Sequence, residues 1–301
     1  MEHDLELRSR AATRVTLLGI GANGLLSVGK LTAGVVGSSA AMVADGVHSI
    51  SDLATDLVVL VTLRIARTPE DRRHQFGHGK FETLAALFVG VALIAVALGL
   101  AYSSVTSIVR VAQGEVLPQP GLIALAAAAA SIVVKEIVFR LTRRTGRGIG
   151  SKALEANAWH HRSDALSSVG ALLGIGLAAF LGPAFRIFDP IAGLLISLVI
   201  CLVAGRIIKN TLSELVEASV DNSTLDRVLK LAADVPGVSD PHKLRMRRVG
   251  SYLVLDLHVR MPGSLSLTDA HRLAHQVEDA ITQDLGKATI VTIHTEPADA
   301  E

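Results

Sequence analysis

The 301-residue sequence has a single cysteine, Cys201, and only 3% aromatic residues. One cysteine cannot form an intrachain disulfide or a thiolate zinc cage, which excludes a disulfide-stapled secreted domain and a cysteine-based zinc finger. Only 19% of the residues are charged, while 50% are hydrophobic and the mean hydropathy is +0.46. This balance excludes a disordered or collagen-like chain and is too apolar for an ordinary soluble protein of this length.

Three common functional signatures are also missing or broken. The segment 24–31 nearly spells a phosphate-binding loop, but it ends in Leu, lies in an apolar window and follows no strand. No H-E-x-x-H motif occurs, which removes the commonest intramembrane zinc-protease signature. Basic residues lie at the borders of apolar windows and not among aromatic residues. We therefore expect no nucleotide and no nucleic acid as a ligand.

The sequence does contain apolar windows of spanning length, six of them before residue 211. A helix needs about 20 residues to cross a bilayer core of about 30 Å. The windows predict an α-helical membrane protein with six transmembrane helices, in a domain of residues 1–211. The acidic, polar start of the chain is not that of a cleavable signal peptide, so we expect the first helix to be retained. The windows are 12–36, 40–66, 82–112, 120–142, 152–181 and 188–210.

Basic residues gather before the first window, between the second and third, between the fourth and fifth, and at the end of the sixth. The remaining loops contain one basic residue, Arg186. The positive-inside rule then places both termini in the cytoplasm, as an even number of spans requires. We expect a bacterial inner membrane, with a specialised intracellular membrane as the alternative.

Two of the windows contain a histidine followed four residues later by an aspartate. His48 and Asp52 lie in the second window, and His160 and Asp164 lie in the fifth. Residues four apart share a helix face, so each pair presents an imidazole and a carboxylate together. At a rise of about 1.5 Å per residue, His48 is about 14 Å and His160 about 15 Å inside from opposite ends. Both pairs are expected at one depth, as a four-ligand site that suits Zn²⁺.

Other interpretations of these groups remain open. They can form interhelical hydrogen bonds or a proton relay without a metal, although four ionisable groups in lipid are costly without a common partner. His161 also reaches Asp164, at i+3, and is an alternative ligand to His160. The donor set also accepts Cd²⁺, Co²⁺ or Fe²⁺. Asp45 and Asp56 are expected to line the path and not to bind the metal.

Three motifs make the sequence resemble the cation diffusion facilitators, a family of metal–proton antiporters. They are H-S-I-S-D at 48–52, H-H-R-S-D at 160–164 and F-G-H-G-K-F-E-T-L-A-A-L at 76–87. The resemblance covers nearly the whole chain and implies a homodimer of the bacterial zinc/iron type. Family members with two His and two Asp in this site are typically zinc transporters. A D-x-x-x-D motif in the second helix points instead to transport of manganese, or of iron and a broader range of transition metals. His48 therefore favours zinc.

The loop before the third window contains Asp71, His74 and His78, a three-ligand set if the segment turns helically. In bacterial relatives the matching Asp and two His bind a second, more exposed metal. The alternative is a cationic anchor loop whose histidines cap the next helix. The resemblance also implies an ion pair between Lys80 and the acid after the sixth helix, here Glu217, that locks the dimer.

Residues 212–301 carry a net charge of −5, against +6 for residues 1–211. In the segment 251–262 apolar and polar residues alternate as in a half-buried strand. The pattern predicts an α+β domain of order α-β-β-α-β with its helices on one face of a small sheet. The resemblance implies that this domain is metallochaperone-like, lies in the cytoplasm, and serves metal binding and dimerisation. The predicted elements are 222–234, 242–248, 251–262, 267–285 and 288–295.

The resemblance assigns metal ligands in this tail to His242, His258, His271 and His294. Glu296 shares a strand face with His294 and stands where relatives commonly have an Asp that bridges two metals. Glu is one methylene longer than Asp. We therefore expect Glu296 to bind a metal, and whether it bridges two metals is open. The alternative is a set of exposed histidines on a solvated domain.

These features together predict a transporter and not an enzyme. We expect it to export Zn²⁺ from the cytoplasm in exchange for protons, within membrane lipid, with metal binding to the tail as regulation. One alternative is a transporter of Fe²⁺, Mn²⁺, Co²⁺ or Cd²⁺ on the same frame, and another is a membrane metal sensor or scaffold that does not transport. An intramembrane metalloenzyme ranks last, because four protein ligands leave no open coordination position.

Overall fold

The computed structural model describes residues 2–66, 68, 71–149, 152–250, 252–286 and 289–298. Some side chains in the helices lie outside this description, namely those of 2–13, 55–66, 149, 152–157, 160 and 163. The chain forms two compact units, one of residues 1–57 and 89–206 and the other of 58–88 and 207–301. The domain boundary at residue 211 stays a prediction.

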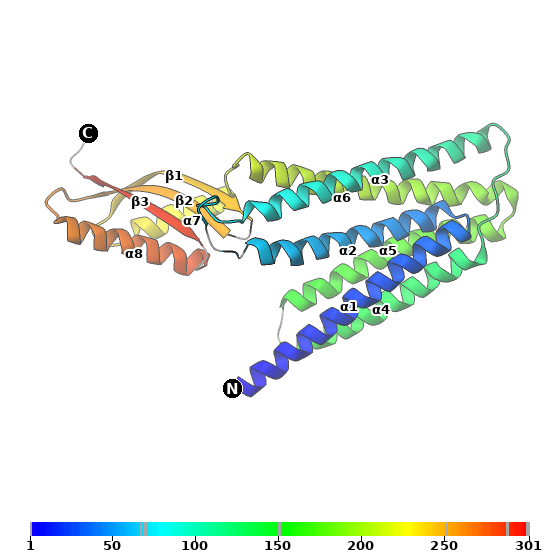
Figure 1. The fold of residues 1–301 in the computed structure, drawn as a ribbon, viewed down its shortest axis with the longest axis horizontal. Helices are drawn as coiled ribbons and strands as arrows, with labels where there is room; N and C mark the ends of the chain where they lie inside the picture. Colours follow the sequence, from blue (N-terminus) through cyan, green and yellow to red (C-terminus); the bar gives the residue numbers. More distant parts are fainter. Residues whose placement is uncertain are drawn as a thin grey trace. The chain divides into compact units, whose positions relative to one another are not determined.

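Six long helices make up the first two-thirds of the described chain (Figure 1). They follow the predicted windows, with three differences at their ends: the first begins at Glu2 and not at residue 12, the fourth continues to Ile149 and not to 142, and the sixth continues to Leu215 and not to 210. Arginines fill the last turns of the fourth helix, where a cation stabilises the C-terminal end of a helix. The helices are α1 (Glu2–Val36), α2 (Ala40–Ala66), α3 (Lys80–Ala112), α4 (Leu122–Ile149), α5 (Lys152–Phe180) and α6 (Phe188–Leu215), with a short 3₁₀ helix η1 (Pro183–Ile187) before α6.

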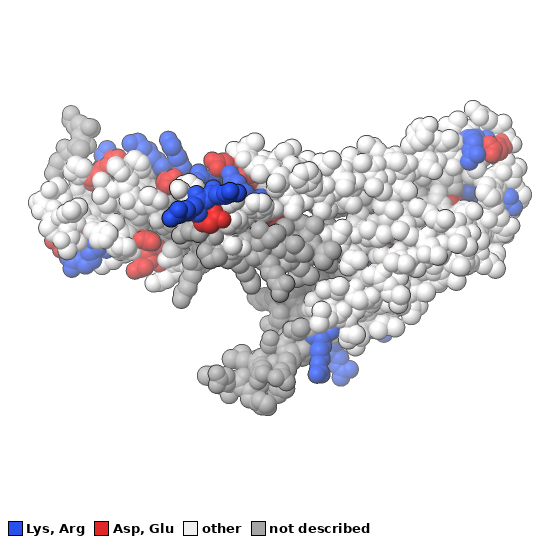
Figure 2. All heavy atoms as spheres, viewed as in Figure 1, with Lys and Arg blue, Asp and Glu red and all other residues white. Residues whose placement is uncertain are grey.

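Among the described residues, four helices are long and apolar enough to cross a membrane: Arg14–Val36, Lys80–Ala112, Leu122–Gly148 and Pro183–Leu215. Their large apolar side chains face outward, as in Leu25, Phe88 and Leu202. On the face drawn in Figure 2, charged side chains gather over the C-terminal elements and at helix ends, and most of α3 and α6 is uncharged. Exposed apolar surface of this extent marks a lipid-facing protein. Six spans stay a prediction, because α2 and α5 are not among the four.

Small residues let the helices of the first unit approach closely. A Cβ on Gly34 would lie 2.7 Å from the backbone nitrogen of Val43, and a Cβ on Gly46 would lie 2.9 Å from that of Leu31. The buried core between these helices is built largely of alanine. Helices α1, α4 and α5 run side by side in Figure 1, and α4 packs against both of its neighbours. Small interfacial residues are the usual means of helix association in lipid.

One carboxylate joins the beginnings of α2 and α6. Asp189 accepts a hydrogen bond from the Ser39 hydroxyl at 2.5 Å and one from the backbone N–H of Ala40 at 2.7 Å. The carboxylate thus satisfies a backbone donor at the N-terminus of α2, where helix donors lack intrahelical partners.

The C-terminal elements follow the order α-β-β-α-β. They are α7 (Asn222–Ala233), β1 (Ser239–Val249), β2 (Tyr252–Met261), α8 (Leu267–Leu285) and β3 (Ile290–Pro297). Both helices begin at capping side chains, Asp221 and Ser266, which accept hydrogen bonds from backbone N–H groups. The sheet is mixed, because β2 pairs with β1 antiparallel and with β3 parallel.

The alternation predicted for the second strand places its apolar side chains against the helices. Leu255, Leu257 and Val259 are fully buried and pack with Val277 and Ile281 of α8. The side chains of the intervening residues point to the other face of the sheet. That face is where the histidines of the strands lie.

Candidate metal centres

The first candidate centre lies between α2 and α5. His48, Asp52 and Asp164 each offer a ligand atom, and these atoms all lie within 4.8 Å of one another. His48 and Asp52 are one helical turn apart on α2 and half-buried, and Asp164 is buried on α5. An imidazole nitrogen and two carboxylates that share a space of this size match the donors of a divalent transition metal.

The structure brings three of the four predicted ligands together. The side chain of His160 lies outside the described residues. The alternative ligand His161 is buried against α1, where a Cβ on Gly19 would lie 3.4 Å from its Nε2. His161 is therefore not a member of the described cluster, because its ring is turned toward another helix.

Sequence reasoning missed a buried ion pair beside this centre. The Lys30 Nζ lies 2.8 Å from the Asp45 Oδ2, and both side chains are almost fully buried, at 1% and 0% exposure. The same ammonium donates to the hydroxyls of Ser49 and Ser168, and Asp45 accepts from Ser167 and Ser168 at 2.8 Å. The signal was a lysine inside an apolar window, a costly placement that requires a partner.

A second lysine lies closer still to the candidate ligands. The Lys135 Nζ on α4 is 3.9 Å from the Asp164 Oδ2, and these side chains are 2% and 6% exposed. The sequence places this lysine in the middle of an apolar window, as it does Lys30. The pairing across α4 and α5 was not readable without the packing of the two helices.

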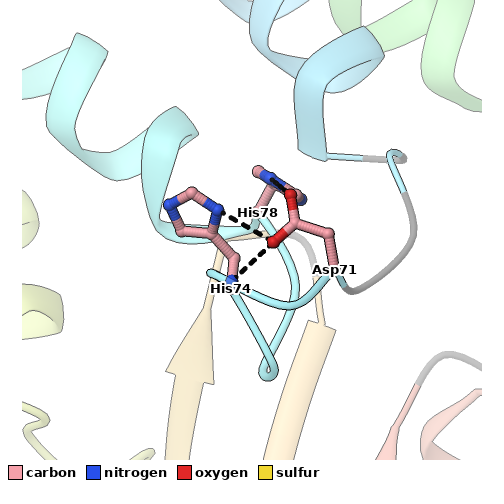
Figure 3. Close-up of side chains that lie close together, drawn as sticks. All are labelled: Asp71, His74 and His78. Atoms are coloured by element: carbon pink, nitrogen blue, oxygen red, sulfur yellow. Dashed lines mark hydrogen bonds and ion pairs between the residues drawn. The ribbon is translucent and has the colours of Figure 1, made fainter.

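The second candidate centre is the loop before α3, drawn in Figure 3. Ligand atoms of Asp71, His74 and His78 lie within 4.8 Å of one another. The Asp71 carboxylate accepts hydrogen bonds from the backbone N–H groups of Arg73 and His74, both at 2.7 Å, and these bonds lower the pKa of Asp71. The three residues meet without the helical turn on which the prediction was conditional, because the Asp71 carboxylate closes the loop through its hydrogen bonds to the backbone.

Glycines let this loop dock on the hairpin of β1 and β2. A Cβ on Gly79 would lie 2.7 Å from the ring of Tyr252 and 2.9 Å from Val249. The Tyr252 hydroxyl donates to the backbone carbonyl of Phe76 at 2.9 Å. Glu214, another residue that sequence reasoning missed, accepts from the Thr83 hydroxyl at 2.5 Å and from the Gly250 N–H at 2.6 Å.

The predicted partners Lys80 and Glu217 form an ion pair of 2.9 Å within one chain. Arg247 on β1 lies 3.4 Å from the other oxygen of Glu217. The hydrogen bond from Lys80 and the charge of Arg247 lower the pKa of Glu217. This pair connects the first residue of α3 to the segment that follows α6.

The third candidate centre lies on the open face of the C-terminal sheet. The strand register puts His242, His258 and His294 side by side across β1, β2 and β3. Glu296 lies beside this row, with its Oε1 2.7 Å from the His258 Nδ1 and its Oε2 3.3 Å from the His242 Nε2. The bond from His258 is the main cause that lowers the pKa of Glu296.

His271 does not reach this row of histidines in the single chain. It lies on α8, and the Nε2 atoms of His271 and His275 are 3.2 Å apart. Helix α8 packs on the apolar face of the sheet, whereas the row of histidines lies on the opposite face. The sheet itself separates His271 from the others, which agrees with the predicted placement of both helices on one face of the sheet.

Several known proteins are similar in sequence to nearly the whole of this chain. Metal tolerance protein 2 of Oryza sativa subsp. japonica is 35% identical over 96% of this chain and 79% of its own length. Metal tolerance protein C1 of Arabidopsis thaliana is 37% identical over 95% of this chain, which spans only 62% of that relative. The manganese efflux system protein MneP of Bacillus subtilis is 30% identical over 96% of this chain and 97% of its own length.

Two family models cover most of the chain. Residues 16–216 match the cation efflux transmembrane domain, which contains the centre between α2 and α5. Residues 220–298 match the cytoplasmic domain of cation efflux proteins, which contains the row of histidines on the sheet. The chain is an integral membrane protein and belongs to the cation diffusion facilitators, a family of metal cation transporters.

Proposed function

We propose that this protein is a homodimeric secondary transporter that exports a divalent transition metal, Zn²⁺ first, from the cytoplasm in exchange for protons. The observation that carries the proposal is the cluster of His48, Asp52 and Asp164 between α2 and α5. His160 is the fourth ligand in this proposal. Ionisable groups at such a place are costly and mark an ion pathway.

The same residues supply the coupling to protons. A metal needs a neutral imidazole and ionised carboxylates, so its binding displaces protons from His48 and from the two aspartates. A site that opens to one side at a time then couples metal exit to proton entry. The energy comes from the proton gradient, with no nucleotide involved.

The proposal keeps six spans, the domains 1–211 and 212–301, and both termini in the cytoplasm. The basic loops support this orientation, because positive charge is retained on the cytoplasmic side. We place the protein in a bacterial inner membrane. The loop and tail centres would then face the cytoplasm and respond to metal there.

Zinc is proposed because a nitrogen donor from His48 stands in a position where relatives of other specificity have an aspartate. Manganese is the second candidate, since a manganese efflux protein is similar over nearly its whole length. Hard oxygen donors suit Mn²⁺ better than imidazole does. Replacement of His48 by Asp is therefore expected to shift the preference from Zn²⁺ toward Mn²⁺ in competition between the two metals.

The test is metal uptake into proteoliposomes that contain the purified full-length protein, a metal-sensitive dye and a pH probe. The wild type is expected to take up Zn²⁺ with opposite movement of protons. Asp164→Asn removes a ligand without a large change of volume and is expected to abolish both signals. Asp226→Asn changes an exposed carboxylate on α7 and is the matched control.

Each other outcome has a defined meaning. Flux of Mn²⁺ or Fe²⁺ without flux of Zn²⁺ would support the proposed transport activity and contradict the proposed preference for Zn²⁺. Metal flux without proton movement would overturn the antiport. No flux of any dication, with metal still bound by the tail, would favour a membrane metal sensor.

A further inference from the structure

Among the described side chains, two polar contacts between α4 and α5 lie one helical turn apart on each helix. The hydroxyls of Ser131 and Ser168 lie 3.1 Å apart, and the ammonium of Lys135 lies 3.9 Å from the Asp164 carboxylate. Residues 131 and 135 share a face of α4, and residues 164 and 168 share a face of α5. The Lys135 side chain therefore points directly at a candidate metal ligand.

The ammonium of Lys135 lies in an apolar environment, only 2% exposed. Asp45, the nearby acid, already holds Lys30 at 2.8 Å and the hydroxyls of two serines. The carboxylate that the Lys135 ammonium faces is that of Asp164, at 3.9 Å. Little water screens the attraction between a buried ammonium and such a carboxylate.

We propose that Lys135 is a tethered cation of the transport site. In the metal-free protein its ammonium balances the charge of Asp164, and an entering metal must displace the ammonium from that carboxylate. The inference rests on the proposed function, because it requires Asp164 to be a transport ligand. Lys135 is a positioning residue that acts through Asp164.

A tethered cation gives this site two properties. Exchange of the ammonium for a monovalent cation leaves the positive charge beside Asp164 unchanged, whereas exchange for a dication increases it by one. The site therefore selects for dications. The ammonium also neutralises the Asp164 carboxylate while the metal-free site changes back from outward-open to inward-open. This lowers the free-energy cost of an unpaired charge within the membrane.

The experiment measures metal affinity and two transport modes in the full-length protein. The loop and tail centres are disabled in the background by Asp71→Ala and His258→Ala, so that binding reports the membrane site. Lys135→Met removes the charge and keeps the length of the side chain, and Lys135→Arg keeps the charge. Equilibrium binding of Zn²⁺ is compared with Zn²⁺/Zn²⁺ exchange and with net uptake in proteoliposomes.

Loss of the competing charge is expected to tighten Zn²⁺ binding by at least about tenfold in Lys135→Met. Exchange is expected to continue while net uptake falls, and Lys135→Arg is expected to resemble the background protein. Unchanged or weaker binding in a folded Lys135→Met protein would overturn the inference, since a merely structural lysine would not oppose the metal.

A structure of the wild-type protein with Zn²⁺ bound tests the inference without a variant. The metal is expected to be bound by the Asp164 carboxylate, and the Lys135 Nζ is expected to have left its position beside that carboxylate. An ammonium that stays at Asp164 beside a bound metal would overturn the inference. If the background protein neither binds nor transports any dication, the proposed function fails first, and the inference fails with it.

Discussion

Lys80 and Glu217 lie 137 positions apart in the sequence, yet their side chains form an ion pair of 2.9 Å within one chain. Lys80 is the first residue of α3, and Glu217 follows the end of α6 in a left-handed backbone conformation, with φ of 59°. Arg247 of β1 shares the same carboxylate. One glutamate thus connects two long helices to the C-terminal sheet.

Replacement of Glu217 by Gln is expected to lower the melting temperature of the purified protein at pH 7. The folded protein holds the pKa of Glu217 below its ordinary value of 4.5, so its contribution is present above pH 4.5 and is lost as the pH falls through the folded pKa. Thermal unfolding of both proteins between pH 7 and pH 3 checks this. A difference in melting temperature that stays constant over that range would contradict the prediction, and Asp226→Asn serves as the exposed control.

Replacement of Gly79 by Ala is expected to displace the loop that contains Asp71, His74 and His78. The new Cβ would lie 2.7 Å from the Tyr252 ring, too close for either group to stay in place. Overpacking of this kind costs about 1–3 kcal/mol. We expect a lower affinity of the loop for Zn²⁺, measured by calorimetry on the full-length protein.

The control for this loop is Gly99→Ala in α3, where a Cβ would meet nothing within 4 Å. It is expected to leave the binding of Zn²⁺ unchanged. Equal affinities in the two alanine variants would show that the loop does not need its close approach to the hairpin.

Replacement of Glu296 by Gln is expected to weaken metal binding on the C-terminal sheet by about tenfold or more. The glutamate touches both His242 and His258, and its lowered pKa keeps it ionised well below neutral pH. Metal binding is expected to weaken as the pH falls, because protons compete for the imidazole nitrogens. Titration of the full-length protein with Zn²⁺ at several pH values measures both effects.

His275→Ala is the matched control, since His275 lies on α8 on the other side of the sheet. Its removal is expected to leave this affinity unaltered. If His275→Ala weakened binding as much as Glu296→Gln did, the row of histidines would not be the site.

Replacement of Asp45 by Asn is expected to destabilise the protein by about 3–5 kcal/mol, because it leaves the buried Lys30 without its ionic partner. The double variant Lys30→Met/Asp45→Asn removes the stranded charge and is expected to recover much of that loss. Unfolding in mixed micelles of increasing denaturing detergent measures the series. Equal stability of the double variant and Asp45→Asn would rule out a mutually dependent pair.

The sequence predicted those features that depend on local pattern. Apolar windows placed the long helices, and the alternation around Leu255 and Leu257 placed a strand and its buried face. Spacing of four residues was enough to pair His48 with Asp52, since that geometry belongs to any helix. Matching depths were enough to bring Asp164 to the same place.

Features that depend on packing between elements were not accessible in this way. The sequence shows Lys30 and Lys135 as costly residues, but their partners follow from which helices touch. The register of the three strands put His242, His258 and His294 in one row. The ligand set around Asp71 forms in a non-helical turn, because a side-chain carboxylate competes for backbone N–H groups.

The hydrogen bonds of Asp189 restrict how α2 can move. The carboxylate grips Ser39 and Ala40, so the first turn of α2 stays attached to the first turn of α6. His48 and Asp52 lie farther along α2 from this held end. A tilt of α2 about Ala40 would therefore displace Asp52 farther than His48, because Asp52 lies one helical turn farther from the held end.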